Sequence, residues 1–184
     1  TTPVTALAVI AILADAPLGL VIALALSALG DLALSRDGEP AFLIGLSSFT
    51  LAHSAYIVLF LDVAHFDLPI LSACLILFAV STEWWLIPHT AALRWPVRIY
   101  VGLITCMGIA ALMLPPALVL ALYGAAAFVL SDTLLSIQLF RMPANSPWQK
   151  PISMALWALY YTAQALICLA FLSGAFSIPI FGIR

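Results

Sequence analysis

Two aspartates lie inside long apolar stretches of this sequence, where an ionisable side chain costs free energy. Asp31 falls in the second such stretch and Asp132 in the sixth. A charged group at the centre of a transmembrane helix costs about 2.5–3.5 kcal/mol on insertion scales, so a residue of this kind suggests a function. Two carboxyl groups close together can act as general acid and general base, or they can relay protons across a membrane.

Further polar residues occupy the same kind of environment. His53 lies near the middle of the third apolar stretch, and Tyr56 follows three residues later on the same helical face. The last stretch contains Tyr161 and Gln164. We expect these side chains to orient a carboxyl group, a water or a substrate. The alternative for each is a structural role, because His, Tyr and Gln often bridge neighbouring membrane helices.

The composition indicates a membrane protein. Of 184 residues, 65% are hydrophobic and 8% are charged, whereas roughly a quarter of the residues in a soluble domain are charged. A net charge of −2 gives no reason to expect a nucleic-acid partner. The three cysteines, Cys74, Cys106 and Cys168, lie in apolar stretches at spacings that suit neither a disulfide framework nor a zinc site. We interpret them as packing residues.

Long, continuous apolar stretches predict helices, since each backbone polar group inside a membrane must be satisfied internally. The predicted fold is all-α, a polytopic transmembrane bundle forming one domain over residues 1–184. Seven segments are expected at about 3–14, 17–35, 40–61, 68–87, 97–114, 116–140 and 150–173. The first would span only ~18 Å, so we expect either a re-entrant helix or, since no initiator Met is present, an eighth helix missing before it.

The loops predict the orientation of the bundle. If the helices cross in turn, the loops near 36–40, 88–96 and 141–150 share one side. That side holds five of the six basic residues, namely Arg36, Arg94, Arg98, Arg141 and Lys150. Four tryptophans lie there too, as in an interfacial aromatic belt: Trp84, Trp85, Trp95 and Trp148. The positive-inside rule places this side in the cytoplasm, and the compact loops suggest a bacterial inner membrane.

Several short patterns together resemble the YhhN-like lysoplasmalogenase family of membrane hydrolases. They are, in chain order, Gly30-Asp31, Phe42…Gly45-Leu46…Phe49…His53…Tyr56, Arg94-Trp95-Pro96-Val97…Tyr100, Gly124-Ala125…Phe128…Ser131-Asp132 and Tyr160-Tyr161…Gln164…Ile167. Members of this family are expected to have eight helices, with Lys-Pro near the start of the second, where this chain has Thr2-Pro3. The resemblance adds Tyr100 and Ser131 to the candidate substrate-binding residues.

The resemblance implies hydrolysis of the vinyl-ether bond of lysoplasmalogens, giving a fatty aldehyde and a glycerophospho-headgroup. Protonation of a vinyl ether leaves an oxocarbenium ion that water then attacks, a demand that two carboxyl groups can meet. Asp132 lies deeper along its helix than Asp31 and should be the more desolvated of the two, so we assign it the acid and Asp31 the base. Arg36, or one of the other arginines on that side, is expected to hold the phosphate.

The expected partners are therefore a lysophospholipid within the bilayer and water. No metal or other cofactor is expected, because this chemistry requires none and a single buried His gives no ligand set. His53 completes the candidate catalytic residues. The oligomeric state stays open.

A rival hypothesis is a small proton-coupled transporter or channel in which the two aspartates relay protons. A short internal echo supports it, since Gly30-Asp31 and Ser131-Asp132 are each followed by a Ser four residues after the Asp, and transporters are often built from repeats. Both acids lie toward one side, however, and no polar trail leads to the other. A third reading is a lipid-binding or assembly protein with structural aspartates.

Overall fold

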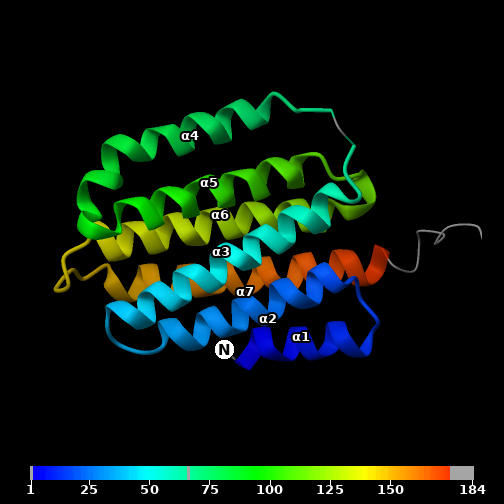
Figure 1. Cartoon of the computed structure of the whole chain (residues 1–184), viewed down its shortest axis with the longest axis horizontal. Coiled ribbons are helices and arrows are strands. Elements are labelled where there is room, and N and C mark those ends of the chain that lie inside the picture. The colour runs from blue at the N-terminus through cyan, green and yellow to red at the C-terminus, as the bar shows by residue number, and fades with distance from the viewer. Residues whose placement is uncertain (1, 66, 175–184) are drawn as a thin grey trace, which may run out of the picture.

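The computed structural model describes residues 2–65 and 67–174, with side chains as far as Leu172. The described residues form seven α-helices and no strand, in an all-α bundle (Figure 1). The helices are α1 (Thr2–Leu13), α2 (Leu18–Leu34), α3 (Glu39–Leu61), α4 (Leu71–Trp85), α5 (Arg94–Leu112), α6 (Val119–Phe140) and α7 (Gln149–Gly174). The predicted fold class is confirmed.

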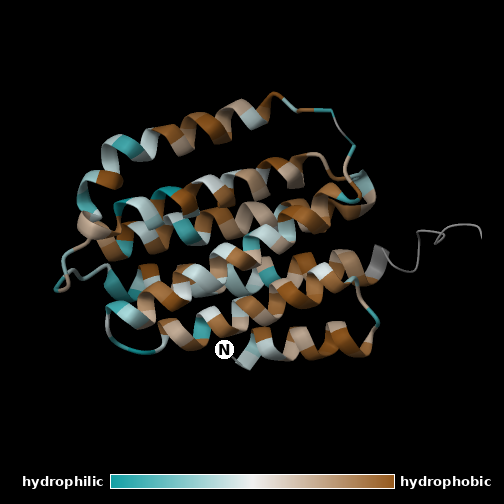
Figure 2. Ribbon diagram, in the orientation of Figure 1, coloured by the Kyte–Doolittle hydropathy of each residue, from teal (hydrophilic) through white to brown (hydrophobic). Residues whose placement is uncertain are grey.

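Most of the described helices have the length and surface of membrane spans, whereas α1 and α2 are apolar but shorter. Five helical segments are long and apolar enough to cross a bilayer, namely Glu39–Leu61, Leu71–His89, Ala91–Leu112, Pro116–Phe140 and Gln149–Leu172. Large apolar side chains face outward, among them Leu77 and Val58, which are 69% and 68% exposed. Figure 2 shows hydrophobic residues along the helices, and hydrophilic ones in the loops and at helix positions mostly in the left half of the view. An outward apolar surface is stable in hydrocarbon.

Two predicted helix boundaries differ from the structure at the connection between α4 and α5. The fourth helix ends at Trp85, and two short 3₁₀-helices, η1 (Ile87–His89) and η2 (Ala91–Leu93), follow it. The fifth begins at Arg94 rather than near 97. Pro96 therefore lies in the first turn of α5, where a missing N–H removes no helical hydrogen bond.

The loops separate into two sets, as predicted. Those joining α2 to α3, α4 to α5 and α6 to α7 lie at one end of the bundle, on the left of Figure 1. We call this the basic end, because Arg36, Arg94 and Arg141 lie in or beside these loops. At this end Arg98 of α5 donates two hydrogen bonds to Glu83 of α4, at 2.8 and 2.6 Å. Glu83 thus ties α4 to α5.

Glycines allow the closest helix contacts in the bundle. A Cβ added at Gly124 of α6 would lie 2.9 Å from the carbonyl oxygen of Ala163 on α7. One added at Gly30 of α2 would lie 2.6 Å from the ring of Phe49 on α3. Small residues of this kind let membrane helices approach each other closely. The two helix pairs so formed, α2 with α3 and α6 with α7, carry most of the candidate site.

Gly124→Ala is expected to lower the free energy of unfolding in detergent by about 1–3 kcal/mol, because the backbone of α7 cannot yield as a side chain would. The matched control is Gly102→Ala on α5, where nothing lies within 4 Å of the added Cβ and the change should be neutral or favourable. Denaturant titration of both variants measures the difference. Equal stability of the two would contradict the packing described for Gly124.

Candidate active site

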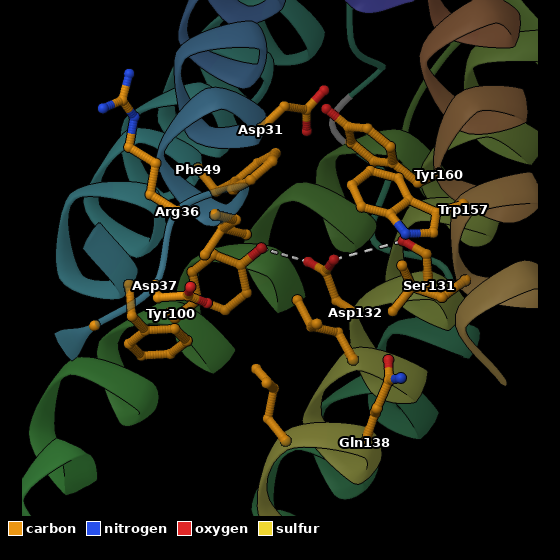
Figure 3. Close-up of a pocket in the computed structure, with 16 residues that line it drawn as sticks. Asp31, Arg36, Asp37, Phe49, Tyr100, Ser131, Asp132, Gln138, Trp157 and Tyr160 are labelled. Atoms are coloured by element: carbon orange, nitrogen blue, oxygen red, sulfur yellow. Dashed lines mark hydrogen bonds between the residues drawn. The ribbon is translucent and has the colours of Figure 1, made fainter. Parts of the chain in front are cut away.

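A cavity of about 330 Å³ lies near the basic end of the bundle, between α2, α3, α5, α6 and α7. Both intramembrane aspartates line it, Asp31 from α2 and Asp132 from α6 (Figure 3). Its other polar lining residues are Arg36, Asp37, Tyr100, Ser131, Gln138, Trp157 and Tyr160. The predicted convergence of the two carboxyl groups is thus what the structure shows.

Asp31 occupies the more enclosed part of this cavity. It is 3% exposed, and the close contact at Gly30 brings the ring of Phe49 beside this turn of α2. Tyr160 of α7, which is 4% exposed, directs its hydroxyl toward the Asp31 carboxyl (Figure 3). The Tyr160 ring is held by edge-to-face contacts with Phe49 and Phe128, with centroids 5.8 and 5.5 Å apart.

Asp132 belongs to a chain of hydrogen bonds that joins three helices. Tyr100 of α5 donates from its hydroxyl to Asp132 Oδ2 at 2.5 Å, and the same hydroxyl lies 2.9 Å from His53 Nε2 of α3. Because Tyr100 uses its proton toward Asp132, His53 Nε2 must be the donor to the Tyr100 oxygen. His53 Nε2 also lies 3.4 Å from Asp132 Oδ2. Asp132 Oδ2 is thus the acceptor at the end of this chain, within reach of side chains from two other helices.

The expected order of burial of the two aspartates is wrong. The side chain of Asp132 is 12% exposed, whereas Asp31 is 3% exposed. Depth along a helix axis does not measure burial here, because Asp132 faces an open cavity while Asp31 is enclosed by aromatic side chains. The reason for assigning the acid to Asp132 therefore fails. Burial favours Asp31 as the carboxyl group that keeps a proton.

Three predicted residues lie behind the cavity rather than in its wall. His53, Tyr56 and Gln164 are all fully buried. Tyr56 donates a hydrogen bond to Gln164 Oε1 at 2.5 Å, which joins α3 to α7. His53 is linked to the cavity wall through its contacts with Tyr100 and Asp132, and its Nδ1 lies 3.3 Å from the sulfur of Met107. Tyr56 and Gln164 thus make the contacts expected if their role is structural, because they bridge two neighbouring helices.

Ser131 and Tyr161 differ in their relation to the cavity. Ser131 lines it, donates to the carbonyl of Phe128 at 2.9 Å and lies 3.5 Å from Asp132 Oδ1 (Figure 3). Tyr161 is outside the lining and stacks on Trp157, with ring centroids 5.4 Å apart. Its neighbour Tyr160 takes the place in the wall. The sequence spacing already favoured Tyr160 over Tyr161, because Tyr160 lies four residues before Gln164 and so shares its helical face.

Among the arginines considered for the phosphate, Arg36 is the one in the cavity wall. Arg98 is paired with Glu83, and Arg141 lies 2.7 Å from His89 Nε2. Arg36 is exposed at the mouth, and its guanidinium is turned away from the two carboxyls in Figure 3. A long, exposed side chain can reorient toward an anion at this mouth. Asp37, beside it in the lining, was not singled out from the sequence.

The bridge between Tyr56 and Gln164 predicts a loss of stability when it is broken. Tyr56→Phe leaves the buried Gln164 oxygen without its donor and should lower the free energy of unfolding by about 1 kcal/mol. Added to Gln164→Leu, the same change should cost less than it does alone, which a double-mutant cycle measures. Tyr123→Phe, at an exposed tyrosine of α6, is the control. Additive effects of the two substitutions would rule out the bridge.

Comparison with known proteins supports the family resemblance that the sequence patterns indicate. The model of the YhhN family matches residues 1–171, which include every residue of the cavity wall. No curated protein and no solved structure shows significant similarity to the chain. The resemblance noted in the sequence is thus confirmed at the level of the family. With the match covering nearly all of its 184 residues, this chain belongs to the YhhN family.

Proposed function

We propose that this protein is a membrane-embedded, lysoplasmalogenase-like hydrolase that cleaves the vinyl-ether bond of lysoplasmalogens into a fatty aldehyde and a glycerophospho-headgroup. The observation that carries the proposal is the pair of aspartates, Asp31 and Asp132, in the wall of one cavity within an apolar bundle. The family resemblance supplies the substrate, and the cavity supplies two carboxyl groups in unlike surroundings. Such a difference is the usual basis for dividing acid from base.

In the first step, Asp31 acts as general acid. Its enclosed position favours the neutral carboxyl, which transfers its proton to the vinyl carbon β to the ether oxygen. The π electrons of the double bond form the new C–H bond, and the α carbon and oxygen share the positive charge as an oxocarbenium ion. The Asp132 carboxylate, held by Tyr100, lies in the same cavity wall and stabilises that cation.

In the second step, Asp132 accepts a proton from water as the water oxygen bonds to the α carbon. The product is a hemiacetal. Its collapse breaks the bond between the α carbon and the ether oxygen. Asp132 returns its proton to that oxygen, and the hemiacetal hydroxyl gives its proton to Asp31. Both carboxyl groups regain their starting forms, and the net reaction consumes one water.

Tyr100 and His53 act in this proposal as positioning residues for Asp132. Their hydrogen bonds run from His53 Nε2 to Tyr100 and from Tyr100 to the carboxylate. A carboxylate restrained in this way faces the cavity in a single orientation, as a base requires. At the cavity mouth Arg36 offers a cation for the substrate phosphate. The expected placement of this end in the cytoplasm would put the headgroup on that side of a bacterial inner membrane.

Purified protein is expected to release aldehyde from a vinyl-ether lysophospholipid and none from its ester-linked counterpart. Asp31→Asn and Asp132→Asn should each reduce the rate about 10²–10⁴-fold, since each removes one proton-transfer group. The matched control is Asp62→Asn, which changes an exposed aspartate at the opposite end of the bundle. In D₂O, aldehyde trapped by reduction should carry one deuterium on the former β carbon.

A result without aldehyde from folded wild-type protein would overturn the proposal. The same preparation in liposomes, loaded with a pH-sensitive dye, then tests the transporter hypothesis. Proton flux that is lost in Asp31→Asn and Asp132→Asn but kept in Asp62→Asn would favour it. Full aldehyde release by either cavity variant would exclude that carboxyl group from the mechanism.

A further inference from the structure

A second system of cavities lies on the other side of Asp132, between α4, α5 and α6. The carboxylate cavity and a small cavity of about 40 Å³ share Tyr100 and Asp132 in their linings. That small cavity in turn shares Leu75 and Val129 with a larger one of about 460 Å³. Neighbouring cavities therefore share wall residues, with Asp132 and Tyr100 in the wall between the first two. We call the second and third cavities together the tail groove.

The tail groove has the chemistry of a site for hydrocarbon. The larger cavity is lined by apolar residues of α4, α5 and α6, with Cys74 and Tyr123 as the more polar members. It extends along α6 from Val129 to Leu122, toward the end of the bundle opposite the basic end. From Asp132 to Leu122 is ten residues, about 15 Å of helix. Apolar surface of this length matches a long alkyl chain rather than a polar ligand.

We propose that the tail groove binds the hydrocarbon chain of the lysophospholipid, while the carboxylate cavity holds its vinyl ether and polar headgroup. This inference rests on the proposed function. The scissile bond of such a substrate lies between a chain and a headgroup that must leave it in opposite directions. Asp132 and Tyr100 line both the carboxylate cavity and the small cavity, and the small cavity in turn borders the apolar one. The substrate's own polarity therefore fixes which end enters which cavity.

The groove also has an opening suited to entry from the bilayer. Helix α4 lies at the edge of the bundle beside α5 (Figure 1), and Leu71 and Leu130 in the groove lining are 52% and 56% exposed. A single-chain lipid can thus slide in from the side. Gly108 forms part of the wall, and a Cβ there would lie 3.1 Å from Leu75. The glycine at this point lets the side chain of Leu75 on α4 pack directly against α5.

Filling the far part of the groove should shift the chain-length preference. Ala126, exposed on α6, lines the larger cavity, so Ala126→Phe is expected to reduce kcat/KM for long-chain vinyl-ether substrates at least about tenfold relative to short-chain ones. The control is Ala73→Phe, at an exposed position of α4 outside these linings. An unchanged ratio in Ala126→Phe, or an equal shift in the control, would overturn the inference.

A binding measurement separates this inference from the proposed reaction. The probe is a 1-alkyl lysophospholipid, whose saturated ether bond lacks the vinyl group that is protonated, with a diazirine near the end of its chain. Photolysis in detergent should label α4 and α6 residues of the groove, and Ala126→Phe should lower this labelling while Ala73→Phe should not. Groove labelling without aldehyde release would retain the lipid site and reject the hydrolase. Labelling spread evenly over the lipid-facing helices would reject the tail groove.

Discussion

A carboxyl group inside an apolar helical bundle carries a desolvation cost that nearby groups must offset, and the structure around Asp31 and Asp132 is organised by this constraint. For Asp132 the offset is a hydrogen bond from Tyr100, which in turn accepts one from His53. Asp31 is enclosed beside Tyr160, and burial of this kind favours the neutral form of a carboxyl group, which costs less to desolvate. Two identical side chains thus stand in different surroundings.

The two carboxyl groups and the side chains around them come from five helices, so their placement depends on how closely the helices pack. Gly30 lets α2 approach Phe49 of α3, and Gly124 lets α6 approach the backbone of α7. Phe128 lies at the centre of this packing, with its ring against those of His53, Tyr56 and Tyr160. A fully buried aromatic ring with three such neighbours restrains their orientation. The geometry of the site therefore depends directly on how the helices pack.

The unlike cavities on either side of Asp132 define the orientation of the proposed substrate. The side toward the basic end carries Arg36 and the two carboxyls, and the side toward the opposite end is apolar. A lysophospholipid has the same polarity along its length. In the proposed reaction the bilayer itself would supply such a lipid in a partly aligned form.

The sequence by itself determined the membrane setting, the all-α bundle and the two ends with their loops, because long apolar stretches and the distribution of basic residues are local properties of the chain. It also predicted that Asp31 and Asp132 lie toward the same end of the bundle, because the direction of each helix follows from the number of membrane crossings before it. The tertiary structure decided the rest. Helical periodicity gives the face of Tyr160 relative to Gln164, but it does not say which neighbouring helix meets that face. Contacts between helices far apart in the chain decide the burial of Asp31 and the groove beyond Asp132. They also decide that Arg36, and not the paired Arg98, lies in the cavity wall.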